Sequence, residues 1–340
     1  MKIIHVGNFD RSHNFQTFYH TDHRIFFGLV RNGHMVLQFS DRDTARESNF
    51  LHSKNIGKVK LNKKLIDTCR EVSPDLIMLG HTDLLSCETI ETIRDYIPDI
   101  KIAQYNVDPI FSVKSMDGFK RRIGCTDSSF ITTAGPALKK FHKDNHVLSF
   151  IPNPVDPAID TARNFELSNL KYDVGFSSSG PYRSEIILWL MEHLHDARFN
   201  WIGRNDTNRL YGKNYMDFIS SVKIGLNLPH SELPESKPYL YSSDRMAHYL
   251  GNGLLVFLDN SSGFQDFFSK NEAVFFGSKE ELLEKLEFYL NNDKDRQSIA
   301  KNGHSKVHTF YSSDLVTKYM IERTFNRDLS ESYMWPTELW

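Results

Sequence analysis

The segment YSSDRMAHYLGNGLLVFLD, residues 241–259, concentrates anion-binding groups in front of a long apolar run. Ser242 or Ser243 can cap a helix that begins near Asp244, and a glycine stands where that helix should end. The first amides of a helix lack partners within it, and the helix dipole adds positive charge there. A phosphate can accept those amides together with the planar fork of Arg245. The pattern predicts a phosphate site, and a simply capped helix whose Arg245 pairs with Asp244 or solvent is the alternative.

Four further positions in the same half of the chain could contact this anion. Ser178 and Gly180 belong to the polar loop SSSG, which is small enough to admit a phosphate, and Arg183 follows it. Arg204 lies near the end of another predicted strand. Positive side chains here would stabilise the negative charge of a bound phosphate group. Surface arginines are common, so the convergence of these groups carries more weight than any one of them.

The first half of the chain offers a carboxylate and an imidazole as candidate bases. Asp108, in QYNVDP, directly follows an apolar strand, where it would face a ligand site, and Pro109 fixes the backbone after it. A substrate hydroxyl that acts as a nucleophile needs a base to accept its proton. We predict Asp108 for this role and His23 as the second choice, and a simple Asx-Pro turn is the alternative for Asp108.

Other polar residues follow strands or begin helices in this half. The segment YHTDHR places Asp22 beside His23 at a helix start, where they could act on a sugar hydroxyl or simply be solvated. No second ligand group is spaced to complete a metal site with them. His81, in GHTD, follows another strand and has the same two interpretations. Gly7 and Asn8 follow the first strand and form either a loop near the substrates or a plain turn.

These residues depend on a regular alternation of strands and helices. In the first half, the strand-like runs are KIIHV, MVLQFS, PDLIMLG, KIAQYN, SFITTAG and HVLSFIP. Ile25, Phe26, Leu29 and Val30 share one face of a helix that Gly33 should end. Further helices are expected over residues 61–72, 87–96 and 136–143.

The same rhythm returns in the second half with YDVGFS, RFNWIG, KIGLNL, LLVFLD and AVFFG. Ser278 and Glu281 form a capping box ahead of one helix. Other helices are expected over residues 183–194, 294–308 and 313–325. Strands that are apolar throughout are typical of parallel sheets covered by helices on both faces. The sequence therefore predicts an α/β protein with two Rossmann-like, doubly wound domains facing across a cleft.

The proline-rich stretch PNPVDPAIDTARNFELSNLK separates the two halves and shows no periodicity. The expected organisation is an N-terminal domain, a linker, a C-terminal domain and a tail, over residues 1–151, 152–170, 171–325 and 326–340. The last helix of the second domain could pack back on the first. A cleft between such domains is a common place for a small-molecule site.

Composition narrows the class of protein. With 340 residues and a net charge of −2, the chain shows no sign of a nucleic-acid-binding surface. Its three cysteines, Cys69, Cys87 and Cys125, define neither a disulfide framework nor a zinc site, which favours a reducing compartment. The start MKIIHVGNFD lacks the apolar stretch of a secretory signal, and no run is long enough to span a bilayer. We expect a cytoplasmic protein, and its 25 phenylalanines leave room for peripheral attachment to the inner face of the cell membrane.

From Tyr172 to Phe325 the sequence resembles the C-terminal half of GT-B glycosyltransferases of the group-1 and CgeB-like families. Those families carry R-x-F-E-x-x-A-x-G before an apolar strand, where this chain has RMAHYLGNG, and a later helix with EEL. YDVGFSSSGPYR and FIPNPVD are similar to the strand that opens the second domain and to the crossover segment. IIHVGNF, GLVRNGHMV and KIAQYNVDP are similar to the acceptor-side domain, although the resemblance weakens there.

One departure from the family pattern concerns two glutamates. The retaining enzymes carry E-x7-E, and here these positions hold Leu240 and His248. The contacts of those glutamates with the donor, and the retaining stereochemistry, therefore cannot be carried over. His248 could hydrogen-bond a ribose hydroxyl instead, or be a structural helix histidine.

The resemblance implies a glycosyltransferase that moves a sugar from a nucleotide-activated donor to an acceptor hydroxyl without a metal or other cofactor. The N-terminal domain would bind a glycan or glycolipid acceptor, as in bacterial lipopolysaccharide or capsule synthesis, and the C-terminal domain would bind the nucleotide sugar. Two alternatives remain open: a nucleotide-sugar 2-epimerase on the same fold, and a non-catalytic protein that binds a nucleotide or a glycan.

Overall fold

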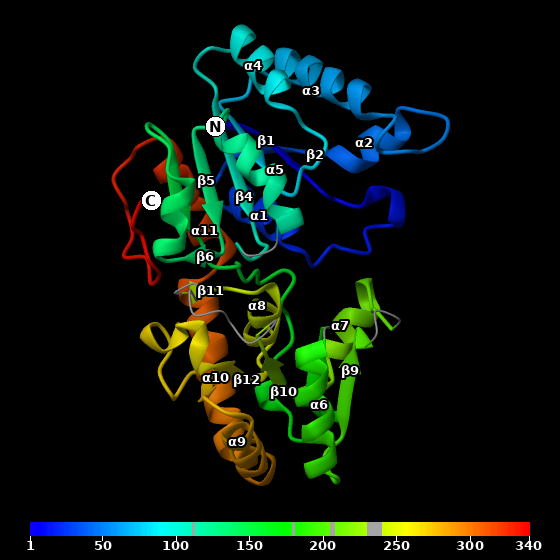
Figure 1. Ribbon diagram of the computed structural model, residues 1–340, viewed down its shortest axis with the longest axis vertical. Helices are drawn as coiled ribbons and strands as arrows, with labels where there is room; N and C mark the ends of the chain where they lie inside the picture. Colours follow the sequence, from blue (N-terminus) through cyan, green and yellow to red (C-terminus); the bar gives the residue numbers. More distant parts are fainter. Residues whose placement is uncertain (111–112, 179–180, 205–207, 230–239) are drawn as a thin grey trace. The chain divides into compact units, whose positions relative to one another are not determined.

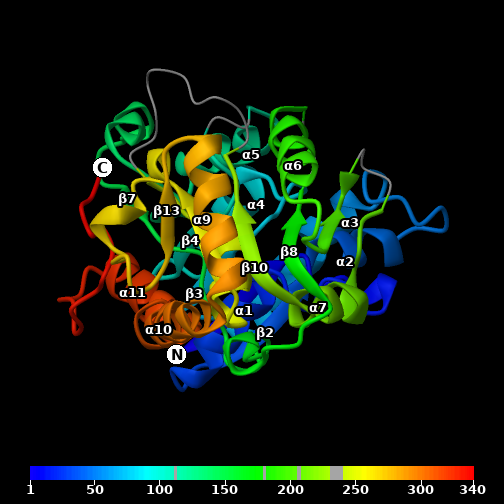
Figure 2. The ribbon, with the colours of Figure 1, turned by 90° about the horizontal axis from the view of Figure 1, so that it is seen from below.

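The computed structural model describes the chain in five stretches, residues 1–110, 113–178, 181–204, 208–229 and 240–340. The chain divides into two compact units (Figures 1 and 2). Unit 1 combines Met1–Pro154 with Ser313–Trp340, and unit 2 is Val155–Ser312. Each unit has a parallel sheet with helices, so the predicted α/β class is confirmed.

Unit 1 is built on a six-stranded parallel sheet with the order β2-β1-β3-β4-β5-β7. The strands are β1 (Lys2–Gly7), β2 (Met35–Ser40), β3 (Leu76–Leu79), β4 (Lys101–Asn106), β5 (Ser128–Ile131) and β7 (Val147–Phe150), and the short β6 (Thr133–Ala134) lies outside this sheet. The central strands are almost fully buried, as their unbroken apolar runs predict.

Helices cover both faces of this sheet. They are α1 (Thr21–Arg31), α2 (Asp41–Glu47), α3 (Lys58–Val72), α4 (Cys87–Tyr96), α5 (Val113–Ile123) and α11 (Ser313–Thr324), with 3-10 turns η1 (Arg11–His13) and η2 (Pro136–Phe141). One apolar cluster packs α2, α3 and α4 against β1, β3 and β4. The late helix α11 packs against the early helix α1 (Figure 1), where a Cβ at Gly28 would overlap the backbone of Ser313.

Unit 2 has a five-stranded parallel sheet with the order β13-β12-β10-β8-β9. Its strands are β8 (Tyr172–Ser177), β9 (Phe199–Ile202), β10 (Val222–Asn227), β12 (Leu255–Asp259) and β13 (Val274–Phe276), and β11 (Leu240–Tyr241) is a short separate strand. The helices are α6 (Pro181–His193), α7 (Gly212–Ser220), α8 (Asp244–Gly251), α9 (Lys279–Asn291) and α10 (Asp293–Phe310), with 3-10 turns η3 (Asn164–Glu166), η5 (Asn260–Ser262) and η6 (Phe264–Asp266). Figure 2 shows α6 on one side of β8 and β10, and α7 and α10 on the other.

Both sheets share the same winding. In each unit the first strand lies inside the sheet, the second lies at the edge beside it, and the later strands continue on the other side. The direction of winding therefore reverses between β1 and β3 in unit 1 and between β8 and β10 in unit 2. Ligands of such sheets bind outside the carboxyl ends of the strands at this reversal. The topology thus points to one candidate site in each unit.

The domain boundaries differ from the expected ones. The predicted C-terminal domain ended at 325, whereas residues from Ser313 onward belong to unit 1. The expectation that the last helix could pack back on the first domain is confirmed, since α11 packs on α1. Residues 155–170, predicted as linker, belong to unit 2. There, Asn164 of η3 donates through Nδ2 to the carbonyls of Ile219 and Val222, both at 2.8 Å.

Two local predictions need correction. Val30, assigned to the buried face of α1, is 44% exposed. Ile25 and Leu29 are fully buried on that helix, and the ring of Phe26 is only partly covered. Three helices were not predicted: α2, which has only seven residues, and α5 and α7, whose amphipathic patterns the sequence analysis did not use.

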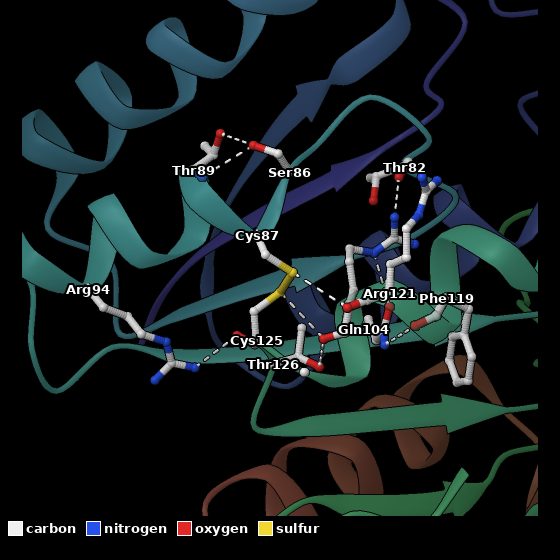
Figure 3. The surroundings of a disulfide bond; sticks show 12 residues. Thr82, Ser86, Cys87, Thr89, Arg94, Gln104, Phe119, Arg121, Cys125 and Thr126 are labelled. Carbon is white, nitrogen blue, oxygen red and sulfur yellow. Dashed lines mark hydrogen bonds between the residues drawn. A yellow bond between two sulfur atoms is a disulfide. The ribbon is translucent and has the colours of Figure 1, made fainter. Parts of the chain in front are cut away.

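A disulfide between Cys87 and Cys125 is a further correction, since the cysteines defined no framework in the sequence. Cys87 begins α4 and Cys125 follows the end of α5, and their Cα atoms lie 5.7 Å apart (Figure 3). The two are separated by 38 positions, so only the fold brings them together. Cys69 is a free, buried thiol.

No helix within the described stretches is both long enough and apolar enough to cross a bilayer.

Candidate functional site

The start of α8 in unit 2 has the capped geometry that the sequence predicts. Ser243 is the N-cap, and its Oγ accepts a hydrogen bond from the Met246 amide at 3.2 Å. The same hydroxyl donates to Oδ1 of Asn227 at 2.9 Å. Asn227 is the last residue of β10, so the cap joins the helix start to the carboxyl end of the sheet. Ser242 beside it is buried.

Arg245 turns toward this strand end and away from Asp244. Its Nη2 donates to Oδ1 of Asn227 at 3.0 Å and to the Leu228 carbonyl at 2.9 Å, and its Nη1 donates to the Ser177 carbonyl at 3.3 Å. The guanidinium also lies 5.0 Å from the ring centroid of Phe176. All these partners are uncharged, and burial lowers the pKa of Arg245. The positive charge therefore has no carboxylate at ion-pair distance within the described stretches.

Arg183 brings a second guanidinium to the same place. Its Nε donates to the Pro229 carbonyl at 3.0 Å, and its Nη1 donates to Oγ of Ser178. Burial, and next the nearby charge of Arg245, lower the pKa of Arg183 to about 9. Like charges this close repel unless an anion lies between or beside them. The switch point of unit 2 therefore carries two arginines, a serine loop and a helix start, which together suit a phosphate or diphosphate.

Two further predicted donor-site residues make contacts outside this hydrogen-bonded group. The Arg204 guanidinium lies 5.1 Å from the ring centroid of Trp201, near the end of β9. His248 is only 4% exposed and hydrogen-bonds through Nδ1 to the Tyr215 hydroxyl at 2.9 Å, as expected for a structural helix histidine. Leu240, at the other departed family position, is buried. Gly180 lies outside the described residues.

In unit 1, Asp22 is the centre of a buried polar group at the β1/β3 switch point. Its carboxylate accepts the Asn8 amide at 2.7 Å and the Tyr105 hydroxyl. A Cβ at Gly7 would lie 2.9 Å from Cγ of Asp22, and one at Gly80 would overlap both Asp22 and Tyr105. The glycines after β1 and β3 are thus required by the close approach of this carboxylate.

His81 and Asp108 form a more exposed pair beside it. Nε2 of His81 lies 3.1 Å from Oδ2 of Asp108, and the two side chains are 35% and 38% exposed. The hydrogen bond with Asp108 raises the pKa of His81, and the Asp22 charge contributes in the same direction. An imidazole oriented by a carboxylate and open to solvent is suited to accept a proton from a substrate hydroxyl.

His23, the second predicted base, is placed less favourably. It is 6% exposed and packs edge-on against Phe9 with ring centroids 5.4 Å apart. Burial lowers its pKa, so the imidazole is neutral but enclosed. Within the described stretches no group of three or more His, Cys, Asp or Glu side chains is arranged to hold a metal ion.

Sequence reasoning missed the residues that connect these groups. Asn227 joins the α8 cap to Arg245, Tyr105 holds Asp22, and the Tyr249 hydroxyl accepts the Ser177 amide at 3.0 Å. Asn227, a polar residue at the end of an apolar strand, was a usable signal. The two tyrosines were not, because each contact joins residues distant in sequence.

The fold is that of the GT-B glycosyltransferases. Anabaena HepE in complex with UDP and glucose matches 96% of this chain with 100% of its own, at 12% identity and a TM-score of 0.56. A glycosyltransferase from Rickettsia africae (96% and 98% covered, 11% identity, TM-score 0.57) and alpha,alpha-trehalose 6-phosphate synthase from Burkholderia multivorans (96% and 98%, 10%, 0.56) are similarly close.

The sequence itself carries a family match in its second half. Residues 183–322 match a family model described as glycosyl transferase-like. This region begins at Arg183 and contains the whole of α8. Residues 183–322 therefore form a glycosyl transferase-like domain, in the part of the chain where the sequence resemblance placed one. A search of curated proteins finds no match to the sequence.

Proposed function

We propose that the protein transfers a sugar from a nucleotide-activated donor to an acceptor hydroxyl. The observation that carries this proposal is Arg245 at the β8/β10 switch point, beside the capped start of α8, where its guanidinium donates to Asn227 and to backbone carbonyls and meets no carboxylate at ion-pair distance in the described stretches. Anabaena HepE was solved with UDP and glucose, and we take a UDP-sugar as the first donor to test.

In the proposed reaction, the His81–Asp108 pair accepts the proton of the acceptor hydroxyl. The acceptor oxygen then bonds to the anomeric carbon while the bond from that carbon to the diphosphate oxygen breaks. Arg245 and Arg183 stabilise the negative charge that develops on the leaving group. A single displacement of this kind inverts the anomeric configuration, in agreement with the absence of the two family glutamates at Leu240 and His248.

The biological role follows from resemblance alone. We propose a member of the CgeB-like group that acts in the cytoplasm on a bacterial surface glycan or its lipid-linked precursor, with no metal cofactor. The support is the set of sequence motifs around RMAHYLGNG and FIPNPVD.

Peripheral membrane attachment has support from one surface segment of unit 1. Phe50, Leu51, Ile56 and Val59 are 95%, 70%, 57% and 80% exposed between α2 and the start of α3. The exposed lysines Lys58, Lys60, Lys63 and Lys64 follow on α3. Apolar side chains next to several lysines suit an anionic bilayer surface. Sedimentation with phosphatidylglycerol vesicles, but not with phosphatidylcholine vesicles, is expected, and its loss in Phe50→Ser/Leu51→Ser would assign the contact to this segment.

The deciding experiment for the function is a donor screen on the full chain. Calorimetry with UDP and other nucleotides should identify the base, and product analysis with glycan acceptors should show the new glycosidic bond. Incubation with donor alone separates the alternatives, because an epimerase would change the free nucleotide sugar and a binding protein would leave it intact in every mixture. A nucleotide panel that binds nowhere would refute the proposal.

A further inference from the structure

A small cavity opens beside His81 in unit 1, at the end of β3 and against α5. Its volume is about 210 Å³, and its walls include Thr82, Gly118, Arg121 and Arg122. Sites for whole drug-sized ligands usually measure roughly 300–1,000 Å³. The cavity therefore suits one functional group and the atoms next to it, and not an entire glycan.

Arg122 gives the cavity a buried cation. The residue is 6% exposed, its Nε donates to Oε1 of Gln104 at 3.0 Å, and its Nη1 donates to the Thr82 carbonyl at 2.5 Å. Both acceptors are uncharged, and no residue in the described stretches accepts from Nη2 or forms an ion pair with this guanidinium. A buried charge of this kind is costly until an anion pairs with it.

Thr82 adds an unused hydroxyl to the same wall. It is 1% exposed, and its Oγ1 has no hydrogen-bond partner within the described stretches. Gly118, one turn earlier on α5, leaves room next to the guanidinium, since a Cβ there would lie 3.3 Å from Nη1 of Arg122. A buried guanidinium whose Nη2 has no acceptor in the described stretches, near a buried hydroxyl that has no partner there, forms a built site for an oxyanion.

Two carboxylates near Arg122 offset its charge only in part. Burial is the largest influence on the pKa of Arg122 and lowers it, whereas the charges of Asp83 and the buried Asp41 raise it without forming an ion pair with the guanidinium. Asp83 also lies 2.7 Å from Nη2 of Arg42 and 3.7 Å from Nζ of Lys54. Arg121 and Asp117 are both exposed on α5, so Arg122 is the buried charge among the cavity's lining residues.

The end of α5 that carries both arginines is also braced. The Cys87–Cys125 disulfide ties the residue after Gly124 to the start of α4, and Figure 3 shows Thr82, Gln104 and Arg121 gathered near it. A site that is held in place before the ligand arrives loses less entropy on binding.

We propose that this cavity binds an anionic group, carboxylate or phosphate, on the acceptor. The inference rests on the proposed function and deepens it: His81 lines the same cavity and belongs to the proposed base pair, so the anion would lie next to the hydroxyl that reacts. The acceptor sugar is then an acidic or phosphorylated one, and a neutral sugar leaves the buried guanidinium unpaired.

The test is an NMR titration of the full chain with three probes: D-glucuronate, D-glucose 6-phosphate and D-glucose. At least one anion should bind, and glucose should bind at least about tenfold more weakly, because it offers no charge-assisted hydrogen bond. The tighter of the two anions identifies the group as carboxylate or phosphate. Equal binding of glucose, or no binding of either anion, would overturn the proposal.

Variants locate the contact. Arg122→Gln should weaken anion binding at least about tenfold. Arg70→Gln removes an exposed cation of α3 and should change the affinity less than about twofold, because surface charges are screened. If Arg122→Gln fails to fold, Gly118→Ala tests the same contact. Alanine favours a helix, so this variant should fold, but its Cβ crowds the Arg122 guanidinium and should weaken anion binding. Wild-type anion affinity in the folded variant contradicts the site.

The two proposals fail in different ways. If UDP-sugar is turned over with neutral acceptors while neither anion binds, the cavity inference is wrong and the glycosyltransferase proposal stands. If an anion binds through Arg122 but no nucleotide binds at Arg245, the cavity inference stands and the donor proposal is wrong.

Discussion

The two switch points of the molecule carry opposite chemistry on the same topology. In unit 2, Arg183 and Arg245 meet carbonyls, an amide oxygen and a serine hydroxyl. In unit 1, the main groups are the carboxylates Asp22 and Asp108, which bond a tyrosine and a histidine. One site can hold negative charge, and the other can take up a proton.

Two sheets with the same winding thus present different functional groups at their switch points. The winding of each sheet fixes where a ligand binds, and the side chains after its strands decide what that place can do. The helix start in unit 2 begins with a serine cap and an arginine, whereas α1 in unit 1 places a buried aspartate and histidine in its first turn.

A substitution at the proposed base tests the difference between the two switch points most directly. Asp108→Asn should reduce the rate of sugar transfer by about 10²–10⁴-fold, the usual contribution of a general base, and leave nucleotide binding unchanged. Steady-state kinetics and calorimetry measure the two effects. Asp83→Asn, at the edge of the same cavity, is the matched control and should change the rate much less. A Asp108→Asn variant with wild-type rate would exclude this pair from the chemistry.

The pH dependence gives the same test without relying on the rate alone. Protonated imidazole cannot accept a proton, so kcat/KM should fall as the pH decreases through the pKa of His81. Asp108 holds that pKa above its usual value of 6.5. In Asp108→Asn the remaining activity should fall only at lower pH. An acidic limb that stays in place would mean that another group titrates.

The disulfide distinguishes the units by stability. Replacing Cys87 and Cys125 with serine should lower the free energy of unfolding of unit 1 by about 2–4 kcal/mol, because the bond closes a long loop in the unfolded chain. Hydrogen exchange should show the loss in unit 1 and not in unit 2. Thiol titration of the unfolded, unreduced protein should find one free cysteine, and a count of three would show that the bond does not form.

Substitutions of two arginines in unit 2 test whether UDP binds at one defined cationic site. Arg245→Gln should weaken UDP binding by about 10–150-fold, the range expected for lost hydrogen bonds to a charged group. Arg204→Gln, which removes a cation stacked on Trp201, should weaken it by less than about threefold, the size of a screened surface interaction. Calorimetry at one salt concentration decides between them. If both variants lost the same UDP affinity, the binding would depend on the overall positive charge of the region and not on a defined contact with Arg245.

The smallest expected effect comes from removing a capping serine, and it tests whether Ser243 also contacts the ligand. Ser243→Ala and Ser278→Ala each remove a serine that caps a helix, and each should cost about 1 kcal/mol of stability. Only Ser243→Ala should also weaken UDP binding, because Ser278 caps α9, where its hydroxyl accepts the Glu281 amide at 3.1 Å. Urea denaturation and calorimetry supply the two measurements.

Much of the architecture could be predicted because it depends on patterns among residues close together in the sequence. The alternation of apolar strands and helices indicated two parallel sheets, and Ser243 was recognised as a cap from its position before α8. The positive φ of Gly33 after α1 also agrees with the predicted helix end. Such features need only neighbouring residues.

What could not be predicted depends on contacts between distant segments. Nothing near Cys87 indicates that Cys125 lies within bonding distance, and nothing near Arg122 indicates that its partners are Thr82 and Gln104. His23 has the right chemistry for a base, but the fold encloses it against Phe9. Only tertiary packing decides whether a reactive side chain is accessible.

The position of α11 has a consequence for biosynthesis. A ribosome releases the first 154 residues of unit 1 long before Ser313–Trp340, which supply a helix packed on α1 and a tail whose Trp340 amide donates to the Leu148 carbonyl at 2.9 Å. Unit 2 is formed by one continuous segment, so it can fold before the Ser313–Trp340 segment of unit 1 has been synthesised. Unit 1 is therefore completed only after unit 2 has been synthesised, and a premature stop near residue 312 would leave unit 1 without α11 and the segment that follows it.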